Sequence, residues 1–469
     1  MSSTLLIVIS TIIILGGATI FSIYLGKKSS DNDWEVGGRN LPLYVIVGTQ
    51  YATAMGGGML VAHVGIGYSN GWSAMTYGCL VAAGLLLLGI IAKWLRQQEF
   101  TTIPDIIANL YGNNKTLLLL TCILTMVVPF GWICTQLVAF GKLYSNLTGI
   151  PQNWLMVIFA MVSLAFVLPA GLKSVAWTDF IFGCLMIAVS FISLGVIFKM
   201  GGGWSNIVAK LPSEIVKFPK GMGSVGISTI LLWSLSIIPG TLTNQMYYQR
   251  VFAADKVNSV RKSLVISGLV IISADAWASA MGISIRALNG GLEPEMASGW
   301  FLTQVPNWFL AIYSGFLVAT IMSTIDSAIH SISVNLTRDI YKKILHPEAG
   351  EDKLNHLSKV YSVGIAAIAV ALSILYPRAL DWVIATYAFS AAGLLFPIFA
   401  GILLKDKESL TVQGAIGSMI CGFIGCIVGM ITKSNIPYVA YGLVGSFLGL
   451  FIISLITKDK IDNLTVKSK

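Results

Sequence analysis

The segment FLVATIMSTIDSAIHSISVNLTRDIY, residues 316–341, is apolar enough at its start to enter a lipid bilayer and then carries a run of hydroxyl side chains. Residues three and four positions apart share one face of an α-helix. The residues that share such a face here, called the hydroxyl stripe below, are Thr320, Ser323, Thr324, Ser327 and Ser331. Asp326 lies at the edge of this stripe. Polar groups at membrane depth are costly and mark functional sites, and hard cations take oxygen ligands. We therefore expect this helix to form half of a cation site, with the other half near residues 52–58.

The composition indicates a membrane protein. The chain has 469 residues, of which 55% are hydrophobic and 11% are charged, and its mean hydropathy is +0.80. Soluble proteins have about 25% charged residues. The apolar residues come in blocks of roughly 20, long enough to cross a hydrocarbon core about 30 Å thick. The fold class expected is an all-α polytopic membrane protein, with residues 1–469 forming one transmembrane transporter domain.

The apolar blocks predict about 13 transmembrane helices. They lie roughly at residues 4–25, 43–68, 73–95, 116–145, 152–170, 174–200, 224–248, 263–286, 304–336, 357–377, 380–404, 411–432 and 437–457. The net charge is +9, and the Lys and Arg residues fall between the blocks, which favours a role in topology over nucleic-acid binding. With the N-terminus outside, 22 of the 30 Lys and Arg residues face the cytoplasm, as the positive-inside rule requires. We therefore expect a multi-pass protein of the plasma membrane with a cytoplasmic C-terminus.

Two of the expected spans contain helix breakers. One span has Gly56-Gly57-Gly58, and another has Pro239-Gly240. Glycine weakens a helix by about 1 kcal/mol relative to alanine, and proline removes a hydrogen-bond donor. The breaks fall in the first span of two successive sets of five, residues 43–200 and 224–404. Paired breaks of this kind indicate an inverted-repeat transporter with a site near the membrane midplane. Close packing through small residues is the alternative.

Several titratable residues fall inside expected spans. Asp179 is expected to face the hydroxyl stripe and to neutralise a cation; an interfacial carboxylate paired with Lys173 is the alternative. Asp275 needs a partner or water, because a lone carboxylate at that depth costs roughly 2.5–3.5 kcal/mol. A proton-linked group, a gate contact and an interhelical hydrogen bond all stay open for it. His63 and His330 are candidates for a proton-linked role, because histidine is the side chain that can change charge near physiological pH; packing roles stay open for both.

No sequence feature indicates an enzyme. The chain has no Walker A motif and no HExxH motif, and none of its six cysteines has the spacing of a metal site. We expect no organic cofactor.

Several short motifs together resemble those of a known family. They are GGRNLP at residues 37–42, ATAMGGGM at 52–59, IPD at 103–105, AWTD at 176–179, YQR at 248–250, MSTIDS at 322–327 and RDIY at 338–341. This set resembles the sodium:solute symporter family. The resemblance implies a five-plus-five inverted repeat with broken first and sixth core helices, a leading helix at 4–25 and two trailing helices within 411–457.

The resemblance also implies where sodium binds. Its first site would take backbone carbonyls and hydroxyls from Ala52, Met55, Thr320, Ser323 and Thr324. Some members have a second sodium site, which maps here to Asp179, Ser323, Asp326 and Ser327. Asp326 stands where other members have serine or alanine, so this second site could be stronger or could bind differently.

Within the family, the glycine run and Tyr247–Val251 look most similar to the choline-transporter branch. That branch cages its quaternary amine with tryptophans through cation–π attraction. Trp132 keeps one of these aromatic walls, but Ala54 and Asn244 replace the other two. The pocket expected is therefore roomier and more polar, suited to an amino acid, a carboxylate or another small polar solute. Its expected lining residues are Ala54, Gly56, His63, Trp132, Asn244, Gln245 and Tyr248.

These features predict a sodium-coupled secondary active symporter that imports a small organic solute by alternating access, with one or two sodium ions as the coupling ion. A proton-coupled symporter using Asp179, Asp275 or His63, and a solute-binding membrane sensor without transport, are the alternatives. The partners expected are the solute and the lipid bilayer, without nucleic acid and without an obligate protein partner.

Overall fold

The computed structural model describes residues 3–26, 37–167, 172–405 and 409–467, and this part of the chain is helical, without a β-sheet. The first half contains α1 (Ser3–Gly26), η1 (Gly37–Arg39), α3 (Leu43–Ala54), η2 (Gly58–His63), α4 (Val64–Asn70), α5 (Ser73–Gln97), α6 (Ile103–Tyr111), α7 (Lys115–Thr148), α8 (Gln152–Val167), α9 (Leu172–Met200), α10 (Trp204–Ala209), α11 (Ser213–Val216) and η3 (Lys220–Gly223). The second half contains α12 (Ile227–Leu242), α13 (Gln245–Ala253), α14 (Val257–Leu288), η4 (Pro294–Met296), α15 (Ala297–Gln304), α16 (Asn307–Val334), η5 (Asn335–Leu345), α17 (Glu351–Leu375), α18 (Ala379–Leu404), α19 (Val412–Thr432) and α20 (Tyr438–Lys467).

The all-helical membrane fold is confirmed, but the count of 13 transmembrane helices is not. Among the described residues, ten helices are long and apolar enough to cross a membrane, or eleven if the bent pair formed by residues 43–54 and 58–70 is one span. Two further apolar helices, at Leu5–Phe21 and Gln152–Ala165, are shorter than a typical span.

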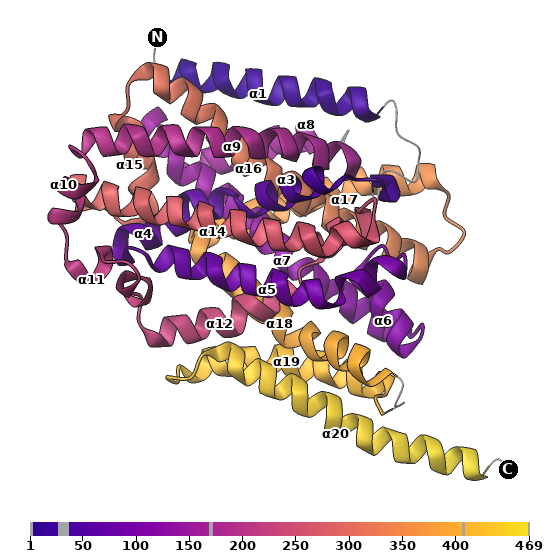
Figure 1. Ribbon diagram of the computed structural model, residues 1–469. Helices are drawn as coiled ribbons and strands as arrows, with labels where there is room; N and C mark the ends of the chain where they lie inside the picture. Colours follow the sequence, from indigo (N-terminus) through magenta and orange to yellow (C-terminus); the bar gives the residue numbers. More distant parts are fainter. Residues whose placement is uncertain (1–2, 27–36, 168–171, 406–408, 468–469) are drawn as a thin grey trace.

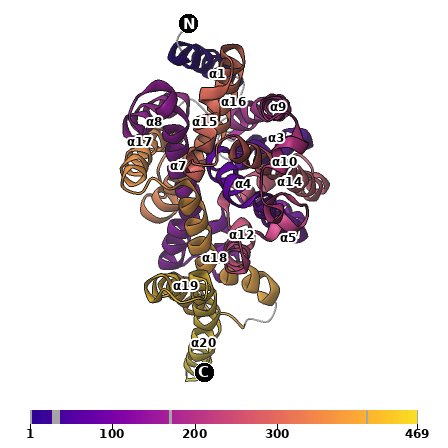
Figure 2. The same cartoon turned by 90° about the vertical axis from the view of Figure 1, so that its left-hand side faces the viewer.

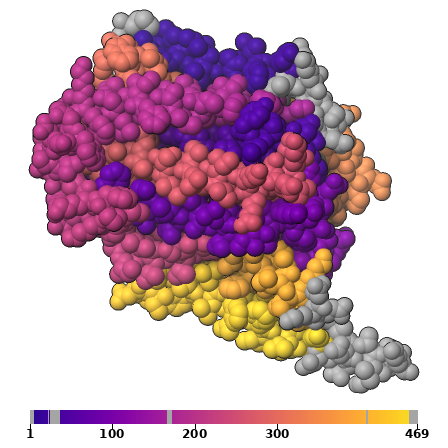
Figure 3. All heavy atoms as spheres, in the orientation of Figure 1, coloured from indigo at the N-terminus to yellow at the C-terminus, as the bar shows by residue number. Residues whose placement is uncertain are grey.

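Helices of residues 43–200 pack against helices of residues 224–404. α5 packs on α14, α7 on α16, and α8 on α17. α3 packs on α9 in the same way that α12 packs on α18. α1 lies along one edge of the bundle, and α19 and α20 lie together at the opposite edge (Figures 1 and 2). In the space-filling view these two trailing helices form a band along the lower side (Figure 3).

The first break lies where the glycines predict it. α3 ends at Ala54, and the next helical segment leaves at an angle of 56°. The glycines also allow neighbouring helices to come close. A β-carbon at Gly56 would lie 2.3 Å from the Thr324 Oγ1 atom of α16, and one at Gly57 would lie 2.5 Å from the Ala139 Cβ atom of α7. This segment therefore needs glycine for the packing of α16 and α7 against it.

The second break lies after Pro239-Gly240 instead of at it. Pro239 is inside α12, which continues to Leu242, and the interruption falls at Thr243 and Asn244. The Thr243 hydroxyl donates to the Pro239 carbonyl oxygen over 3.2 Å and so closes the last turn of α12. The Asn244 side chain accepts from the Met246 amide over 3.0 Å and begins α13 as its N-cap. Capping by these two residues sets the position of the break.

Replacement of Gly56 by alanine tests the close approach of α3 and α16. Because the added methyl group would overlap the Thr324 hydroxyl, we expect Gly56→Ala to lower the melting temperature of the purified protein. Gly195 is the control: it is exposed on α9, and a β-carbon there meets nothing within 4 Å. Gly195→Ala is expected to raise stability slightly, by up to about 1 kcal/mol. Equal melting temperatures for the two variants would contradict this packing argument.

Candidate functional site

The end of α3 contacts the hydroxyl stripe of α16 directly. The Ser323 hydroxyl lies 3.0 Å from the Ala52 carbonyl oxygen and 2.9 Å from the Thr320 carbonyl oxygen. The Thr324 hydroxyl donates to the Thr53 carbonyl oxygen over 2.9 Å. All of these residues are buried. The structure thus brings together four of the five residues expected for the first sodium site.

The fifth residue, Met55, is the C-cap of α3 and is fully buried. The last carbonyls of a helix have no partner within the helix, and the carboxyl end of a helix carries a partial negative charge. The Ala52 and Thr53 carbonyl oxygens therefore meet hydroxyl groups at an end that favours a cation. Broken helices in transporters use unwound carbonyls in this way to coordinate sodium. The arrangement suits a small cation held by oxygen atoms.

A second polar cluster lies one turn further along α16. The Asp179 Oδ2 atom accepts from the Thr49 hydroxyl over 2.7 Å and from the Thr53 and Ser327 hydroxyls over 3.3 Å each. Asp326 lies at the edge of this cluster, and its Oδ1 atom accepts from the Ser327 amide over 2.5 Å. Asp179 and Asp326 are both fully buried.

A positive charge already occupies this acidic cluster. The Arg250 Nη2 atom donates to the Ser327 hydroxyl over 2.6 Å and to the Thr53 hydroxyl over 2.9 Å, and it lies 3.5 Å from the Asp179 Oδ2 atom. Arg250 is only 1% exposed. Its guanidinium stands at the position that the sequence assigned to a second sodium ion.

Sequence analysis did not anticipate this role for Arg250. In the sequence this residue stands out only as the last letter of the YQR motif at 248–250. The available signal was the presence of two carboxylates, Asp179 and Asp326, inside apolar spans. Buried carboxylates are normally paired, so a nearby arginine was the natural candidate.

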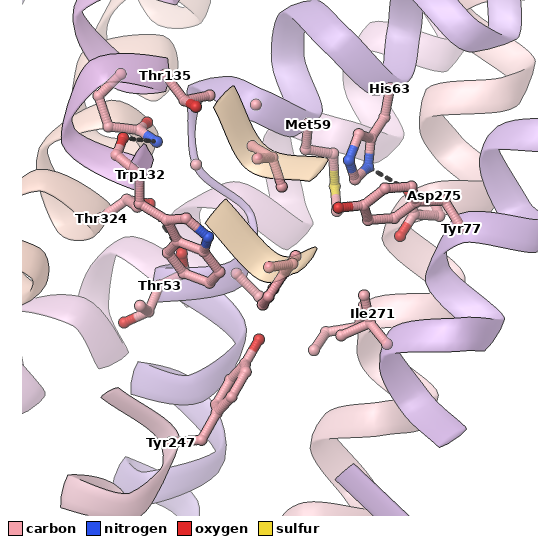
Figure 4. A pocket seen from close by; sticks show the side chains of 17 residues that line it. Thr53, Met59, His63, Tyr77, Trp132, Thr135, Tyr247, Ile271, Asp275 and Thr324 are labelled. Atoms are coloured by element: carbon pink, nitrogen blue, oxygen red, sulfur yellow. Dashed lines mark hydrogen bonds and ion pairs between the residues drawn. The ribbon is translucent and has the colours of Figure 1, made fainter. Parts of the chain in front are cut away.

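A cavity lies next to the end of α3, on the side of the glycine run (Figure 4). About 450 Å³ of space that no atom fills lies within it, its open mouth included. Its lining residues are Thr53, Ala54, Gly56, Gly58, Met59, His63, Tyr77, Val81, Trp132, Thr135, Gln136, Tyr247, Ile271, Asp275, Thr324, Val383 and Tyr387. Thr324 thus touches both this cavity and the oxygen cluster at the end of α3.

Four of the seven residues expected at the solute site line this cavity: Ala54, Gly56, His63 and Trp132. The other three have partners elsewhere. Asn244 caps α13, the Gln245 Oε1 atom accepts from the Ile103 amide over 2.9 Å, and the Tyr248 hydroxyl donates to the Leu242 carbonyl over 2.8 Å. The neighbouring Tyr247 lines the cavity in place of Tyr248.

Sequence analysis missed the aromatic residues of the cavity besides Trp132. Tyr77, Tyr247 and Tyr387 come from α5, α13 and α18, helices that are distant in the sequence. The Trp132 ring lies edge-on to both Tyr247 and Tyr387, with centroids 6.3 and 6.1 Å apart. Only the packing of these helices brings the rings together.

Several polar atoms of the cavity wall are buried and have no hydrogen-bond partner in the described part of the chain. They are the Trp132 Nε1 atom, the Tyr77 and Tyr247 hydroxyls and the Asp275 Oδ2 atom. Buried polar atoms normally find a partner. These atoms leave the wall of the cavity able to hydrogen-bond to a bound solute or to water.

His63, one of the expected solute-site residues, and Asp275, for which the sequence leaves several roles open, are in contact. The His63 Nδ1 atom lies 2.6 Å from the Asp275 Oδ1 atom, and the His63 ring packs on Tyr77 with centroids 4.2 Å apart. Both residues line the cavity, and Figure 4 shows the pair on the wall opposite Trp132.

Comparisons with known proteins agree with the fold. The model of the sodium:solute symporter family matches residues 34–422. The high-affinity proline transporter PutP of Bacillus subtilis is 27% identical over 93% of this chain and 95% of its own length. The sodium/glucose cotransporter of Vibrio parahaemolyticus is 23% identical over 89% of this chain and 80% of its own. A substrate-bound, outward-open structure of a Na⁺-coupled sialic acid symporter superposes with a TM-score of 0.80 at 17% identity, over 96% of this chain and 98% of that one.

The charge of Arg250 can be tested by mutation. Arg250→Gln leaves Asp179 and Asp326 buried without a cation, and breaking a buried ion pair costs about 3–5 kcal/mol. We expect a marked fall in melting temperature, which Asp179→Asn partly reverses in the double variant because it removes one of the unpaired charges. Arg378→Gln, at a guanidinium that is 70% exposed, is the control and should change little. A double variant no more stable than Arg250→Gln would show that the pairing contributes little.

Proposed function

This chain belongs to the sodium:solute symporter family, and on that premise we propose that it imports a small polar organic solute by alternating access, driven by sodium bound at the end of α3. Family membership, and relatives that are sodium-coupled symporters, indicate the general function. It is that of a sodium-coupled solute symporter of the membrane and not of an enzyme. The observation that carries the finer proposal is the contact of the Ser323 and Thr324 hydroxyls with the Ala52 and Thr53 carbonyls.

In the proposed site, sodium is held by the carbonyl oxygens of Ala52, Met55 and Thr320 and by the Ser323 and Thr324 hydroxyls. In the structure these hydroxyls donate to the α3 carbonyls and to Thr320. A cation between them accepts lone pairs from all of these oxygens, so each hydroxyl must turn its proton away. The ion thereby links α3 to α16, and its binding favours the conformation in which the two helices are in contact.

We propose one sodium ion at this site as the coupling ion. The second site expected from the sequence, Asp179, Ser323, Asp326 and Ser327, contains the Arg250 guanidinium, which supplies one positive charge without an ion. A second sodium would enter only if Arg250 moved away. At a membrane potential of 100 mV, negative inside, one inward sodium contributes about 2.3 kcal/mol in addition to its concentration gradient.

The solute proposed is small and carries both acceptor and donor groups, such as an amino or imino acid. Trp132 Nε1 and the Tyr247 hydroxyl offer unpaired donors on one wall of the cavity, and Asp275 offers an acceptor on the other. Relatives that are proline transporters support this class. The kinship with the choline-transporter branch, suggested by Tyr247–Val251, stays a prediction.

We also propose how the chain is arranged in the membrane. The repeats would comprise residues 43–200 and 224–404, related by the helix pairs described above, with the N-terminus outside and the C-terminus in the cytoplasm. Proton coupling through the buried His63–Asp275 pair is the rival mechanism that a structural observation favours. Uptake that tracks a pH gradient without sodium would support it.

Two threonines on one face of α16 provide a matched test. The Thr324 hydroxyl faces the α3 carbonyls, whereas the Thr320 hydroxyl donates to the Phe316 carbonyl of its own helix and offers only its backbone oxygen to the site. We expect Thr324→Val to abolish the rise in melting temperature that sodium gives over potassium at equal ionic strength, and to reduce sodium-driven L-proline uptake into proteoliposomes at least tenfold. Thr320→Val should retain both.

Each outcome of this test is informative. A ligand that binds the folded state raises stability by RT ln(1 + [L]/Kd), so the sodium effect reports binding without transport. If both variants lost the rise in melting temperature, the loss would be due to changed packing at the threonines and not to a lost oxygen ligand. An unchanged effect in Thr324→Val would contradict the site.

A further inference from the structure

The wall of the solute cavity that carries His63 and Asp275 has a distinct chemistry. Among the described lining residues, Asp275 is the one carboxylate and His63 the one histidine, and there is no lysine or arginine. We propose that His63 and Asp275 together bind a cationic N–H group, so that the cavity selects solutes with an ammonium or imino nitrogen. This inference rests on the proposed function and assigns its solute-selecting residues.

The pair is held in a fixed geometry. His63 ends the π-helical segment η2, and the centre of its ring lies 4.2 Å from the centre of the Tyr77 ring. The Asp275 carboxylate, fully buried on α14, lies against Gly78 of α5. A β-carbon at Gly78 would come within 2.4 Å of the Asp275 Oδ2 atom, so only glycine leaves room for this carboxylate.

The hydrogen bond between the two residues sets which nitrogen faces the solute. A carboxylate accepts, so the Nδ1 atom of His63, 2.6 Å from the Asp275 Oδ1 atom, carries a proton. The Nε2 atom of the neutral ring then has a free lone pair. Figure 4 shows this second nitrogen turned toward the cavity beside Met59. An N–H donor of the solute can bind to it, with the negative charge of Asp275 behind the ring.

No other charged group in the described chain neutralises this pair. The other titratable side chains that line the cavity are Tyr77, Tyr247 and Tyr387. The charged residues on elements packed against the pair include Lys142 of α7, Arg286 of α14 and Glu295 of η4. Lys142 is paired with Glu295 at 2.7 Å, and Arg286 donates to the Tyr68 and Ser69 carbonyls. The pair with a neutral imidazole therefore keeps one negative charge, which a cationic solute balances.

The rest of the cavity also favours a cation at this wall. Aromatic faces attract ammonium groups, and the rings of Tyr77, Trp132, Tyr247 and Tyr387 all line the space. The Asp275 Oδ2 atom is buried without a hydrogen-bond partner in the part of the chain that is described. An anionic group alone would meet no fixed positive charge here.

Binding of the solute to His63 is expected to depend on pH. The solute N–H group and a proton compete for the same lone pair of the His63 Nε2 atom, so protonation of the ring excludes the solute and solute binding releases the proton. By linkage, the solute Kd rises as pH falls, by up to tenfold per pH unit where the ring is protonated. A cavity that used an imidazolium to bind a carboxylate would show the opposite trend.

Three compounds that share one ring can test the selectivity. L-proline has both charged groups, pyrrolidine has only the cationic nitrogen, and cyclopentanecarboxylate has only the carboxylate. Binding is measured on the purified protein by the rise in melting temperature in sodium, between pH 5.5 and 8.5. We expect L-proline and, more weakly, pyrrolidine to stabilise the protein, and cyclopentanecarboxylate to have no effect. The Kd of L-proline should be higher at pH 5.5 than at pH 8.5.

Two variants and one control connect this selectivity to the pair. His63→Gln removes the imidazole lone pair, so it should raise the Kd of L-proline at pH 8.5 at least tenfold. Because glutamine cannot be protonated, the Kd of this variant should not depend on pH. Asp275→Asn removes the charge and should have the same effect on affinity. His356→Gln, at an exposed histidine of α17, should behave as the wild type does. The sodium effect on melting temperature must persist in all three, which shows that they fold and that the sodium site is intact.

The outcomes separate this inference from the proposed function. Stabilisation by cyclopentanecarboxylate alone, by none of the three compounds, or more strongly at low pH, each in a protein that still responds to sodium, overturns the role of His63 and Asp275. An equal pH dependence in His63→Gln and wild type overturns it as well. Absence of any sodium effect in the wild type would instead contradict the proposed function.

Discussion

The contact between the carboxyl end of α3 and the hydroxyl stripe of α16 is the constraint on which the rest of the structure depends. The Ala52 and Thr53 carbonyls lose their helical partners where α3 ends, and the Ser323 and Thr324 hydroxyls meet them at membrane depth. Unpaired carbonyls in a bilayer cost several kcal/mol each. The break in the helix is therefore stable only while α16 stays close, and the glycines at 56 and 57 make that approach possible. Any solute or ion that acts between these helices shares the same few oxygen atoms.

The oxygen cluster, the cavity and the Asp179 cluster are neighbours that share residues. Thr324 belongs both to the oxygen cluster and to the wall of the cavity. Thr53 offers its carbonyl to Thr324 and its hydroxyl to Arg250, so it joins the oxygen cluster to the Asp179 cluster. A change in the oxygen cluster thus reaches the cavity and the buried arginine through single residues. Coupling between two ligands means that each changes the affinity of the protein for the other, and residues shared by two sites are one way to achieve it.

Much of this fold is predictable from the sequence, because apolar blocks and helix breakers act locally. The hydroxyl stripe at 320–331 and the segment at 52–58 predict the two halves of the oxygen cluster. The position of the second break was wrong by a few residues, since capping by Thr243 and Asn244 determines it and the proline does not. The role of Arg250 and the aromatic wall of the cavity depend on packing between distant helices, which periodicity does not encode. His63 and Asp275 are 212 positions apart, so their pairing was equally hidden.

The central claim is that sodium binds between α3 and α16, and radioactive sodium binding to the purified protein tests it most directly. The account predicts saturable binding of ²²Na⁺ by the wild type, not displaced by potassium, and loss of that binding in Ser323→Ala, whose hydroxyl contacts both the Ala52 and Thr320 carbonyls. Ser273→Ala, at an exposed serine of α14, should bind sodium as the wild type does. Undiminished ²²Na⁺ binding by a folded Ser323→Ala protein would contradict the account.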